Sequence, residues 1–422
     1  MRSKVAVFTM VTAAGVSSTL LLSGCGPTLT ASAGANSATS SAAIETTPAA
    51  NANDASVLAP VNVKVKNGRL TSVTVSSDDS QVAGALAPDG RSWTSTAGQE
   101  LPYGTTYKLT AVAIDGEGRA TQSQQTFTTV TPANTAKPTA PFVSDYGTFG
   151  VGAPITVDFT VPVTNKKEVE QRLHVHSSIP VDGAWGWSQD SKTVVFRPKD
   201  FWPSGAHVTF TGDVYGVKLN DTTYASDDIT LDFNIGDKVI MTVDPATLQM
   251  SVNRNGKVEN TIPVTIGKPE YETYDGIKVI QAKEGTITMK SPPGDPQYYV
   301  APNVEYSMRL NWHGEYLHAA PWAADAFGNY AYSHGCISMT TENAKWLWDN
   351  VKVGDVVTIS GAGHAPPDEN DGITAWNVPW DQWVAKSTTG VQHVVPEPPS
   401  ATPSASTAAT TEAASDAPNS GA

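Results

Sequence analysis

One cysteine of this sequence lies among residue types that can do nucleophilic chemistry. Residues 333–338 read SHGCIS, and their Cys336 is one of only two cysteines in 422 residues. His313, His318 and His334 precede it closely. A neighbouring imidazole converts a thiol into a thiolate, which attacks a carbonyl carbon. Cys336 is therefore a candidate nucleophile, with a histidine as its base.

Two other interpretations of this cluster remain open. Two histidines and a cysteine could bind zinc, although their spacing fits no common zinc pattern. Cys336 could also be an inert core cysteine, because seven of the eleven tryptophans lie between Trp312 and Trp383. Gly335 favours the nucleophile, since a glycine lets the backbone turn tightly and aim N–H groups at an oxyanion.

A helix is predicted directly after the candidate nucleophile, in the stretch TTENAKWLWDNV. Thr340 or Thr341 can cap it, an acidic residue lies in its first turn, and apolar residues recur at helical spacing. Because the positive end of the helix dipole would lie near the thiol, we expect it to lower the pKa of Cys336.

The segments that must position this site are β-patterned. VNVKVKNGRLTSVTVSS alternates apolar and polar residues around Asn67-Gly68, a strong hairpin signal. The fold class is predicted to be mainly β, with two immunoglobulin-like β-sandwiches and then a mostly-β domain that contains the single helix after Cys336. The predicted ranges are 56–135 and 137–236 for the sandwiches, 237–361 for the third domain and 362–386 for a C-terminal extension.

The other cysteine, Cys25, follows a targeting signal. A short basic region, an apolar stretch and small residues are typical of a signal peptide over residues 1–24. A transmembrane anchor is the alternative, but no charged stop-transfer flank follows. LSGC, which ends at Cys25, resembles a bacterial lipobox. That resemblance implies cleavage before Cys25 and its acylation, which would leave Cys336 as the only free thiol.

The two ends of the mature chain have compositions that cannot build a core. Residues 25–55 are rich in Ala, Ser, Thr and Asn and are predicted to be a flexible tether, and residues 387–422 are predicted to be a disordered tail rich in Pro, Ala, Ser and Thr. The formal net charge of −14 argues against a nucleic-acid partner, because phosphate binding needs clustered Lys and Arg.

The motif around Cys336 resembles the signature of the L,D-transpeptidase catalytic domain. HAAPW begins at His318, and SHGCIS follows after a spacer of the length found in that family. VDPATLQMSVNRNGK is similar to the family's opening hairpin, VKVGDVVTI to its closing strand, and AWNVPWDQW to the extension seen when this domain follows immunoglobulin-like domains. The likeness therefore covers most of the chain.

The resemblance implies a thiol acyl transfer on peptidoglycan without a metal or other cofactor. Cys336 would attack the third residue of a tetrapeptide stem, release the terminal D-Ala and pass the acyl group to the amine of another stem. His318 would be the base, oriented by the carbonyl of Ala319, where the family often has Ser. His334 and the amides of Gly335 and Cys336 would line the oxyanion site, and Ser333 belongs to the same motif.

Four further residues are candidates for substrate binding by the same resemblance. Ser338 stands where the family usually has Asn, so a contact with the substrate or the motif loop is expected to differ in strength. A lid tyrosine is either Tyr298 or Tyr299, with Tyr299 favoured. Met289 resembles a donor-pocket position, with a core role as the alternative. Trp322 is expected to line the pocket unless it is simply packed.

Other functions remain compatible with these residues. Water as acceptor would make the protein an L,D-carboxypeptidase, and a protein acceptor would make it an attachment enzyme. A non-catalytic, wall-binding lipoprotein is the alternative from another class. The expected partners are stem peptides, carbapenem-type β-lactams and, through lipidated Cys25, the outer face of the cytoplasmic membrane.

Overall fold

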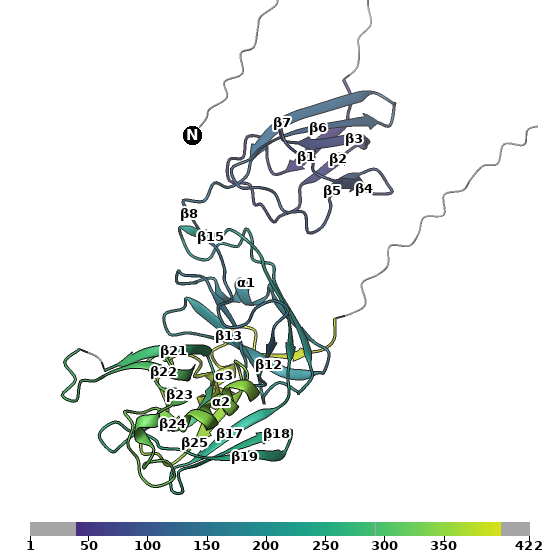
Figure 1. The fold of residues 1–422 in the computed structure, drawn as a ribbon. Coiled ribbons are helices and arrows are strands. Elements are labelled where there is room, and N and C mark those ends of the chain that lie inside the picture. Colours follow the sequence, from purple (N-terminus) through teal and green to yellow (C-terminus); the bar gives the residue numbers. More distant parts are fainter. Residues whose placement is uncertain (1–38, 292, 398–422) are drawn as a thin grey trace, which may run out of the picture.

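The computed structural model describes residues 39–291 and 293–397, which form three β-rich units in a row (Figure 1). The mainly-β prediction is confirmed. The predicted signal peptide, Cys25 and most of the C-terminal tail lie outside the described residues. No helix within the described ranges is long and apolar enough to cross a membrane.

The first unit is a sandwich of two small antiparallel sheets. One sheet has the order β1-β2-β5-β4 and the other β3-β6-β7. In β6 every second side chain faces the core, which is the period expected of a strand with one buried face. The strands are β1 (Ala43–Thr47), β2 (Asn62–Lys66), β3 (Gly68–Ser76), β4 (Gly84–Leu86), β5 (Ser92–Ser95), β6 (Thr106–Asp115) and β7 (Ala120–Thr128).

The predicted start of this unit, residue 56, lies too late in the chain. Strand β1 falls in the segment assigned to the tether, and its residues Ala43 to Thr47 pair with Lys66 to Asn62 of β2. Composition misled the prediction because β1 reads AIETT and contributes little apolar area of its own. Its order comes from backbone hydrogen bonds to β2.

The second unit is also a sandwich, but the chain completes it only near its C-terminus. Its sheets have the orders β10-β13-β12-β26 and β11-β14-β16-β9, and a short pair, β8 and β15, lies at the joint to the first unit. The elements are β8 (Asn134–Ala136), β9 (Thr148–Phe149), β10 (Ile155–Asp158), α1 (Lys166–Glu170), β11 (Leu173–Ser177), β12 (Val181–Trp187), β13 (Thr193–Pro198), β14 (His207–Gly212), β15 (Thr223–Ala225), β16 (Ile229–Ile235) and β26 (Val391–Val394).

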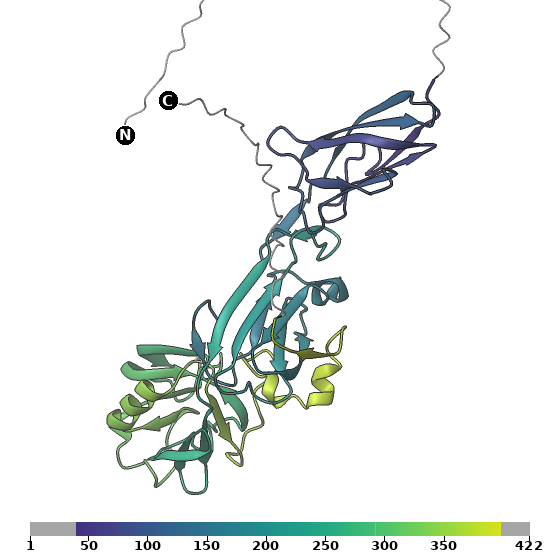
Figure 2. The same ribbon diagram turned by 90° about the vertical axis from the view of Figure 1, so that its right-hand side faces the viewer.

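The predicted disordered tail therefore begins too early, because β26 pairs with β12. The buried carboxylate of Glu170 fixes the preceding segment by accepting hydrogen bonds from the backbone N–H groups of Thr388 and Thr389 and from the Ser387 hydroxyl. Figure 2 shows the C-terminal segment, in yellow, lying against the second sandwich.

The third unit has two sheets with the helix α2 packed beside the second. The first sheet has the order β19-β18-β17-β25-β20 and the second β21-β22-β23-β24. The elements are β17 (Val239–Asp244), β18 (Gln249–Arg254), β19 (Lys257–Pro263), β20 (Gly276–Val279), β21 (Ala282–Lys290), β22 (Val300–Arg309), β23 (Tyr316–Ala319), η1 (Pro321–Ala323), β24 (Ile337–Met339), α2 (Thr341–Asn350) and β25 (Val356–Ile359). The predicted helix is present, and the Thr340 side chain caps it.

The C-terminal extension joins the third unit to the second sandwich instead of packing on the catalytic domain alone. It contains η2 (Ala375–Asn377) and α3 (Trp380–Val384). The Arg197 guanidinium of β13 lies 5.0–5.3 Å from the ring centres of Trp376, Trp380 and Trp383. Trp383 also donates from Nε1 to the Ala184 carbonyl at 3.0 Å. The extension also contacts the third unit, because Asn377 Oδ1 accepts from the Ile277 N–H of β20 at 2.7 Å. Val279 and Val356 of the third unit join the core of the second sandwich, so the last two units form one packed body.

Backbone segments of these two units also approach closely at Gly150. A Cβ atom there would lie 2.1 Å from the Asp355 amide nitrogen. We expect Gly150→Ala to destabilise the protein by about 1–3 kcal/mol, the usual cost of overpacking, and to lower the melting temperature.

Gly116→Ala is the matched control, because no atom lies within 4 Å of the added methyl group. Thermal unfolding followed by circular dichroism distinguishes the two variants. Equal melting temperatures would contradict the prediction, because they would show that the interface at Gly150 accommodates a methyl group without loss of stability.

Candidate active site

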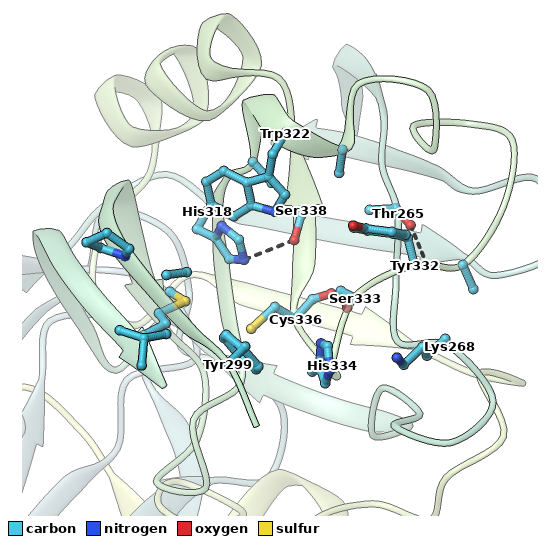
Figure 3. Close-up of a pocket in the computed structure, with 17 residues that line it drawn as sticks. Thr265, Lys268, Tyr299, His318, Trp322, Tyr332, Ser333, His334, Cys336 and Ser338 are labelled. Carbon is cyan, nitrogen blue, oxygen red and sulfur yellow. Dashed lines mark hydrogen bonds between the residues drawn. The ribbon is translucent and has the colours of Figure 1, made fainter. Parts of the chain in front are cut away.

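A cavity of about 510 Å³ opens beside Cys336, between the β21–β22 hairpin, β23, β24 and the loop that precedes β24. Figure 3 shows Cys336 between His318 on one side and Tyr299 with His334 on the other. The walls include all of Met289, Tyr299, His318, Trp322, Ser333, His334, Cys336 and Ser338. The fold thus brings most of the predicted site residues to one cavity.

The Cys336 thiol is buried at the base of this cavity, with 5% of the residue exposed. Its Sγ donates to the Gly314 carbonyl at 3.6 Å and is close enough to the Tyr316 backbone N–H to accept from it. Burial raises the pKa of Cys336 to about 12, because the thiolate would lose its hydration. The thiol is therefore neutral when no substrate is bound.

The expected lowering of this pKa by the helix was wrong. Strand β24 separates Cys336 from α2, which begins at Thr341. The helix dipole acts over about the first turn, so its positive end does not offset the desolvation of the sulfur.

His318 lies in β23 with its imidazole buried and neutral. Its Nδ1 lies 2.8 Å from the Ala319 carbonyl oxygen, the contact that the resemblance implies. Because a carbonyl only accepts, Nδ1 carries the proton and Nε2 carries the lone pair. Burial lowers the pKa of His318 to about 4, so the ring is an unprotonated base at neutral pH.

The Ser338 hydroxyl is hydrogen-bonded to the lone pair on Nε2 of His318. Its Oγ lies 3.0 Å from His318 Nε2, and with that nitrogen unprotonated the hydroxyl is the donor (Figure 3). The contact follows from the parallel pairing of β23 with β24, which sets His318 opposite Ser338. Ser338 also lines the cavity, but its direct partner is the base, which the sequence did not indicate.

The loop before Cys336 is fixed by Ser333. The Ser333 hydroxyl donates to the Cys336 carbonyl at 2.6 Å and accepts from the Gly335 N–H at 3.2 Å. Gly335 has a φ of +110°, a backbone conformation that side chains with a Cβ rarely adopt. Of the two backbone amides predicted to line the oxyanion site, that of Gly335 is therefore engaged with Ser333 in this state.

His334 lies between two aromatic rings, with centroids 4.6 Å from Tyr271 and 4.6 Å from Tyr299. Its Nε2 is buried and has no hydrogen-bond partner in the described part of the chain. Burial also lowers the pKa of His334. An unpaired polar atom on the wall of a cavity suits a group that binds substrate.

Tyr299, and not Tyr298, is at the site. Tyr299 packs with Met289, Tyr316 and Cys336, whereas Tyr298 is 56% exposed. Burial and the nearby sulfur raise the pKa of Tyr299 to about 12, so its hydroxyl keeps the proton.

Comparison with known proteins matches this arrangement to one family. Residues 238–359 match the L,D-transpeptidase catalytic domain model, and residues 52–218 match a bacterial Ig domain model. L,D-transpeptidase 2 of Mycobacterium tuberculosis is 35% identical over 335 residues, which are 78% of this chain and 80% of that protein. L,D-transpeptidase 5 of the same species is 30% identical over 364 residues, 84% of this chain and 78% of that protein.

The chain belongs to the L,D-transpeptidase family. A solved structure of L,D-transpeptidase 3 from Mycobacterium tuberculosis, in complex with a faropenem-derived adduct, has a TM-score of 0.45 and 28% identity, with 53% of this chain and 98% of that chain covered. Membership makes the protein an enzyme of the transpeptidase kind and agrees with the predicted order of immunoglobulin-like domains before the catalytic domain.

In this L,D-transpeptidase, Trp322 lines the cavity with 53% of the residue exposed, so it is not simply packed. Its ring stacks near His318 at 6.2 Å between centroids. Lys268, Tyr332 and Thr265 also line the cavity, although none of them was predicted from the sequence. Tyr332 adjoins the SHGC motif and could have been found there, whereas Lys268 carries no such signal.

His313, the third histidine that lies near Cys336 in the sequence, does not line the cavity. Its Nδ1 lies 2.9 Å from the buried Asp371 carboxylate. Among the described residues, no group of three His, Cys, Asp or Glu side chains is arranged to hold a metal ion.

We expect Ser338→Ala to raise the pKa of His318, because the hydroxyl donates to the lone pair and so favours the neutral ring. Below this pKa the base is protonated, so we expect the acid limb of the acylation rate near pH 4 in the parent protein. The limb should move up by roughly 0.7 pH unit, the equivalent of a hydrogen bond of about 1 kcal/mol.

The measurement is the rate of acylation by a carbapenem as a function of pH. Ser177→Ala, an equally buried serine of the second sandwich, is the control and should leave the profile unchanged. An acid limb that stays in place or moves down in Ser338→Ala would contradict the assigned donor.

Proposed function

We propose that this protein is a peptidoglycan L,D-transpeptidase that works through a thioester on Cys336. The donor is a tetrapeptide stem, and the product links the third residues of two stems. The observation that carries the proposal is the neutral pair at the base of the cavity, a buried Cys336 thiol beside the unprotonated His318. Such a pair is suited to acyl transfer to and from sulfur.

In the first half of the reaction, Nε2 of His318 takes the thiol proton while Sγ bonds to the carbonyl carbon of the third residue. The C–N bond to the terminal D-Ala then breaks, and its amine takes that proton from His318. The products are a thioester and free D-Ala. For this step the Ser338 hydroxyl must turn away from Nε2, which needs only a rotation about its own side chain.

In the second half, the side-chain amine of another stem attacks the thioester carbon. The amine gives a proton to His318, the C–S bond breaks, and the sulfur regains that proton. A new amide links the two stems and the thiol is restored. No water is consumed, so the cavity must favour the amine over water.

The negative oxygen formed in both halves needs donors close to Cys336. The buried Nε2 edge of His334 supports its assignment to this role, with the ring in the tautomer that places hydrogen on that nitrogen. The Gly335 amide joins it if the Ser333 hydroxyl releases its hydrogen bond. Tyr299, Met289 and Trp322 would contact the stem from the cavity walls.

The neutral resting state also suits a protein outside the cytoplasm. A thiol with a pKa near 12 resists oxidation, because the thiolate is the reactive form. A β-lactam carbonyl offers Sγ the same kind of electrophile as the stem, so we infer that carbapenems acylate Cys336.

The test uses the full chain mixed with a disaccharide-tetrapeptide, with products separated by mass spectrometry and Cys336→Ala as the control. We expect a dimeric muropeptide only from the parent chain. Loss of the nucleophile should reduce the rate by several orders of magnitude, as for other covalent catalysts.

Two other results would redirect the proposal. Tripeptide without dimer would identify an L,D-carboxypeptidase. No product from a folded parent chain would favour a binding lipoprotein, and equal product from Cys336→Ala would exclude Cys336 as the nucleophile.

We also propose that Cys25 is acylated and anchors the protein to the outer face of the cytoplasmic membrane, with the first two sandwiches as spacers below the catalytic domain. In cells, Cys25→Ser should move the protein from the membrane fraction to the soluble fraction, because several acyl chains bind firmly and none remains. Palmitate labelling and fractionation measure this, and an unchanged membrane fraction would point to a transmembrane anchor.

A further inference from the structure

A buried ion pair lies behind the catalytic cysteine. Lys278 and Glu315 are 2% and 4% exposed, and Nζ of Lys278 lies 2.7 Å from Oε1 of Glu315. Removing two charges from water is expensive, and an apolar pair of equal volume is often as stable. Stability alone therefore does not account for this pair, and its contacts with the neighbouring backbone indicate a positioning role.

The pair fixes the turn between β22 and β23. Glu315 is the last residue of this turn, directly before β23. Its Oε2 accepts from the Asn311 side chain at 3.1 Å. Asn311 in return accepts from the Glu315 N–H at 2.9 Å. Lys278 also donates to the Tyr274 carbonyl, so the base of the turn is tied to the entry of β20.

A second carboxylate, Asp371 of the C-terminal extension, fixes the tip of the same turn. Its Oδ1 accepts from the backbone N–H groups of Trp312 at 2.8 Å and His313 at 2.9 Å. Asp371 is 1% exposed and lies beyond the residues that match the catalytic domain model, which end at 359.

The two residues that flank Glu315 both hydrogen-bond to the sulfur of Cys336 through their backbones. The Gly314 carbonyl accepts from Sγ of Cys336, and the Tyr316 N–H donates to it. The position of the sulfur therefore depends on the backbone on both sides of Glu315.

We propose that Lys278 and Glu315 are positioning residues for the Cys336 nucleophile, because they hold the turn whose backbone groups orient Sγ toward the cavity. The inference rests on the proposed role of Cys336. It adds residues outside the SHGC motif to the machinery of the reaction.

The same pair also acts on the sulfur through its charges. The Glu315 carboxylate raises the pKa of Cys336 and the Lys278 ammonium lowers it, so the two effects oppose each other while the pair is intact. Burial raises the pKa of Glu315 and lowers that of Lys278, and each charge partly restores its partner. The other ionisable groups that line the cavity or act on the thiol and the pair include Tyr299, Tyr316, His318, His334, Lys268, Tyr274, Asp275, Asp368 and Asp371.

The test measures the thiol directly, without peptidoglycan. The full chain with Cys25→Ser has Cys336 as its single thiol, and its alkylation by iodoacetamide is followed by intact mass at several pH values. Below the thiol pKa, the rate is proportional to the thiolate fraction, and one pKa unit changes it tenfold.

We expect Glu315→Gln to speed alkylation and Lys278→Met to slow it, each by roughly threefold to tenfold. The double variant should return towards the parent rate, because both charges are gone. Carbapenem acylation should fall in both single variants, because it needs the sulfur correctly oriented as well as ionised.

Glu170→Gln is the matched control, since it makes the same change at an equally buried carboxylate in the second sandwich. It should lower the melting temperature and leave both rates unchanged. Should Lys278→Met not fold, Glu315→Gln and the double variant still carry the test.

A purely structural role would give single variants that resemble Glu170→Gln, and that result would overturn the proposal. Alkylation rates that change in the same direction in both single variants would also overturn it. Opposite changes in a chain that forms no muropeptide would keep the positioning role and reject the transpeptidase function, so the two failures are distinguishable.

Discussion

The site depends on the desolvation of two titratable groups, Cys336 and His318. Burial raises the pKa of the thiol and lowers that of the imidazole, so the proton stays on sulfur in the resting state. An ion pair between them is therefore not the resting form, in contrast to enzymes that store a thiolate. In the proposed reaction, the proton therefore leaves the sulfur only as the substrate carbonyl arrives. Catalysis would therefore depend mainly on the orientation of Cys336 and His318 and on the hydrogen-bond donors around the new oxyanion.

The surrounding fold supplies that orientation through backbone contacts. Parallel pairing of β23 with β24 sets the base opposite Ser338, and the turn before β23 presents a carbonyl and an amide to the sulfur. The C-terminal extension reaches both this turn, through Asp371, and the second sandwich, through its tryptophans beside Arg197. The extension thereby links the catalytic domain to the neighbouring sandwich.

The residues of the motif were predictable because the signature is local and chemically specific. Cys336, His318 and the Ala319 carbonyl lie within short stretches of sequence, and the helix after them has clear capping and period signals. The boundary at β1 was not predictable, since its sequence AIETT has a tether-like composition and gains its order by pairing with β2. Strand β26 reads VQHV and has strand-like residues, but it is too short to be recognised without its partner β12, which lies far away in the sequence. The pair Lys278–Glu315 was missed for a similar reason, as its members are 37 residues apart and neither belongs to a motif. The predicted direction of the Cys336 pKa shift was wrong, because the nearness of a helix in the sequence does not reveal that the thiol is buried.

The most direct test of the central claim is the covalent intermediate itself. The full chain is incubated with a tetrapeptide stem that lacks a usable acceptor amine, quenched in acid and mapped by mass spectrometry. The account predicts that the peptide containing Cys336 gains the mass of the stem minus D-Ala, and that neutral hydroxylamine removes the adduct. Release of D-Ala without any adduct on Cys336, or an adduct on another residue, would contradict it.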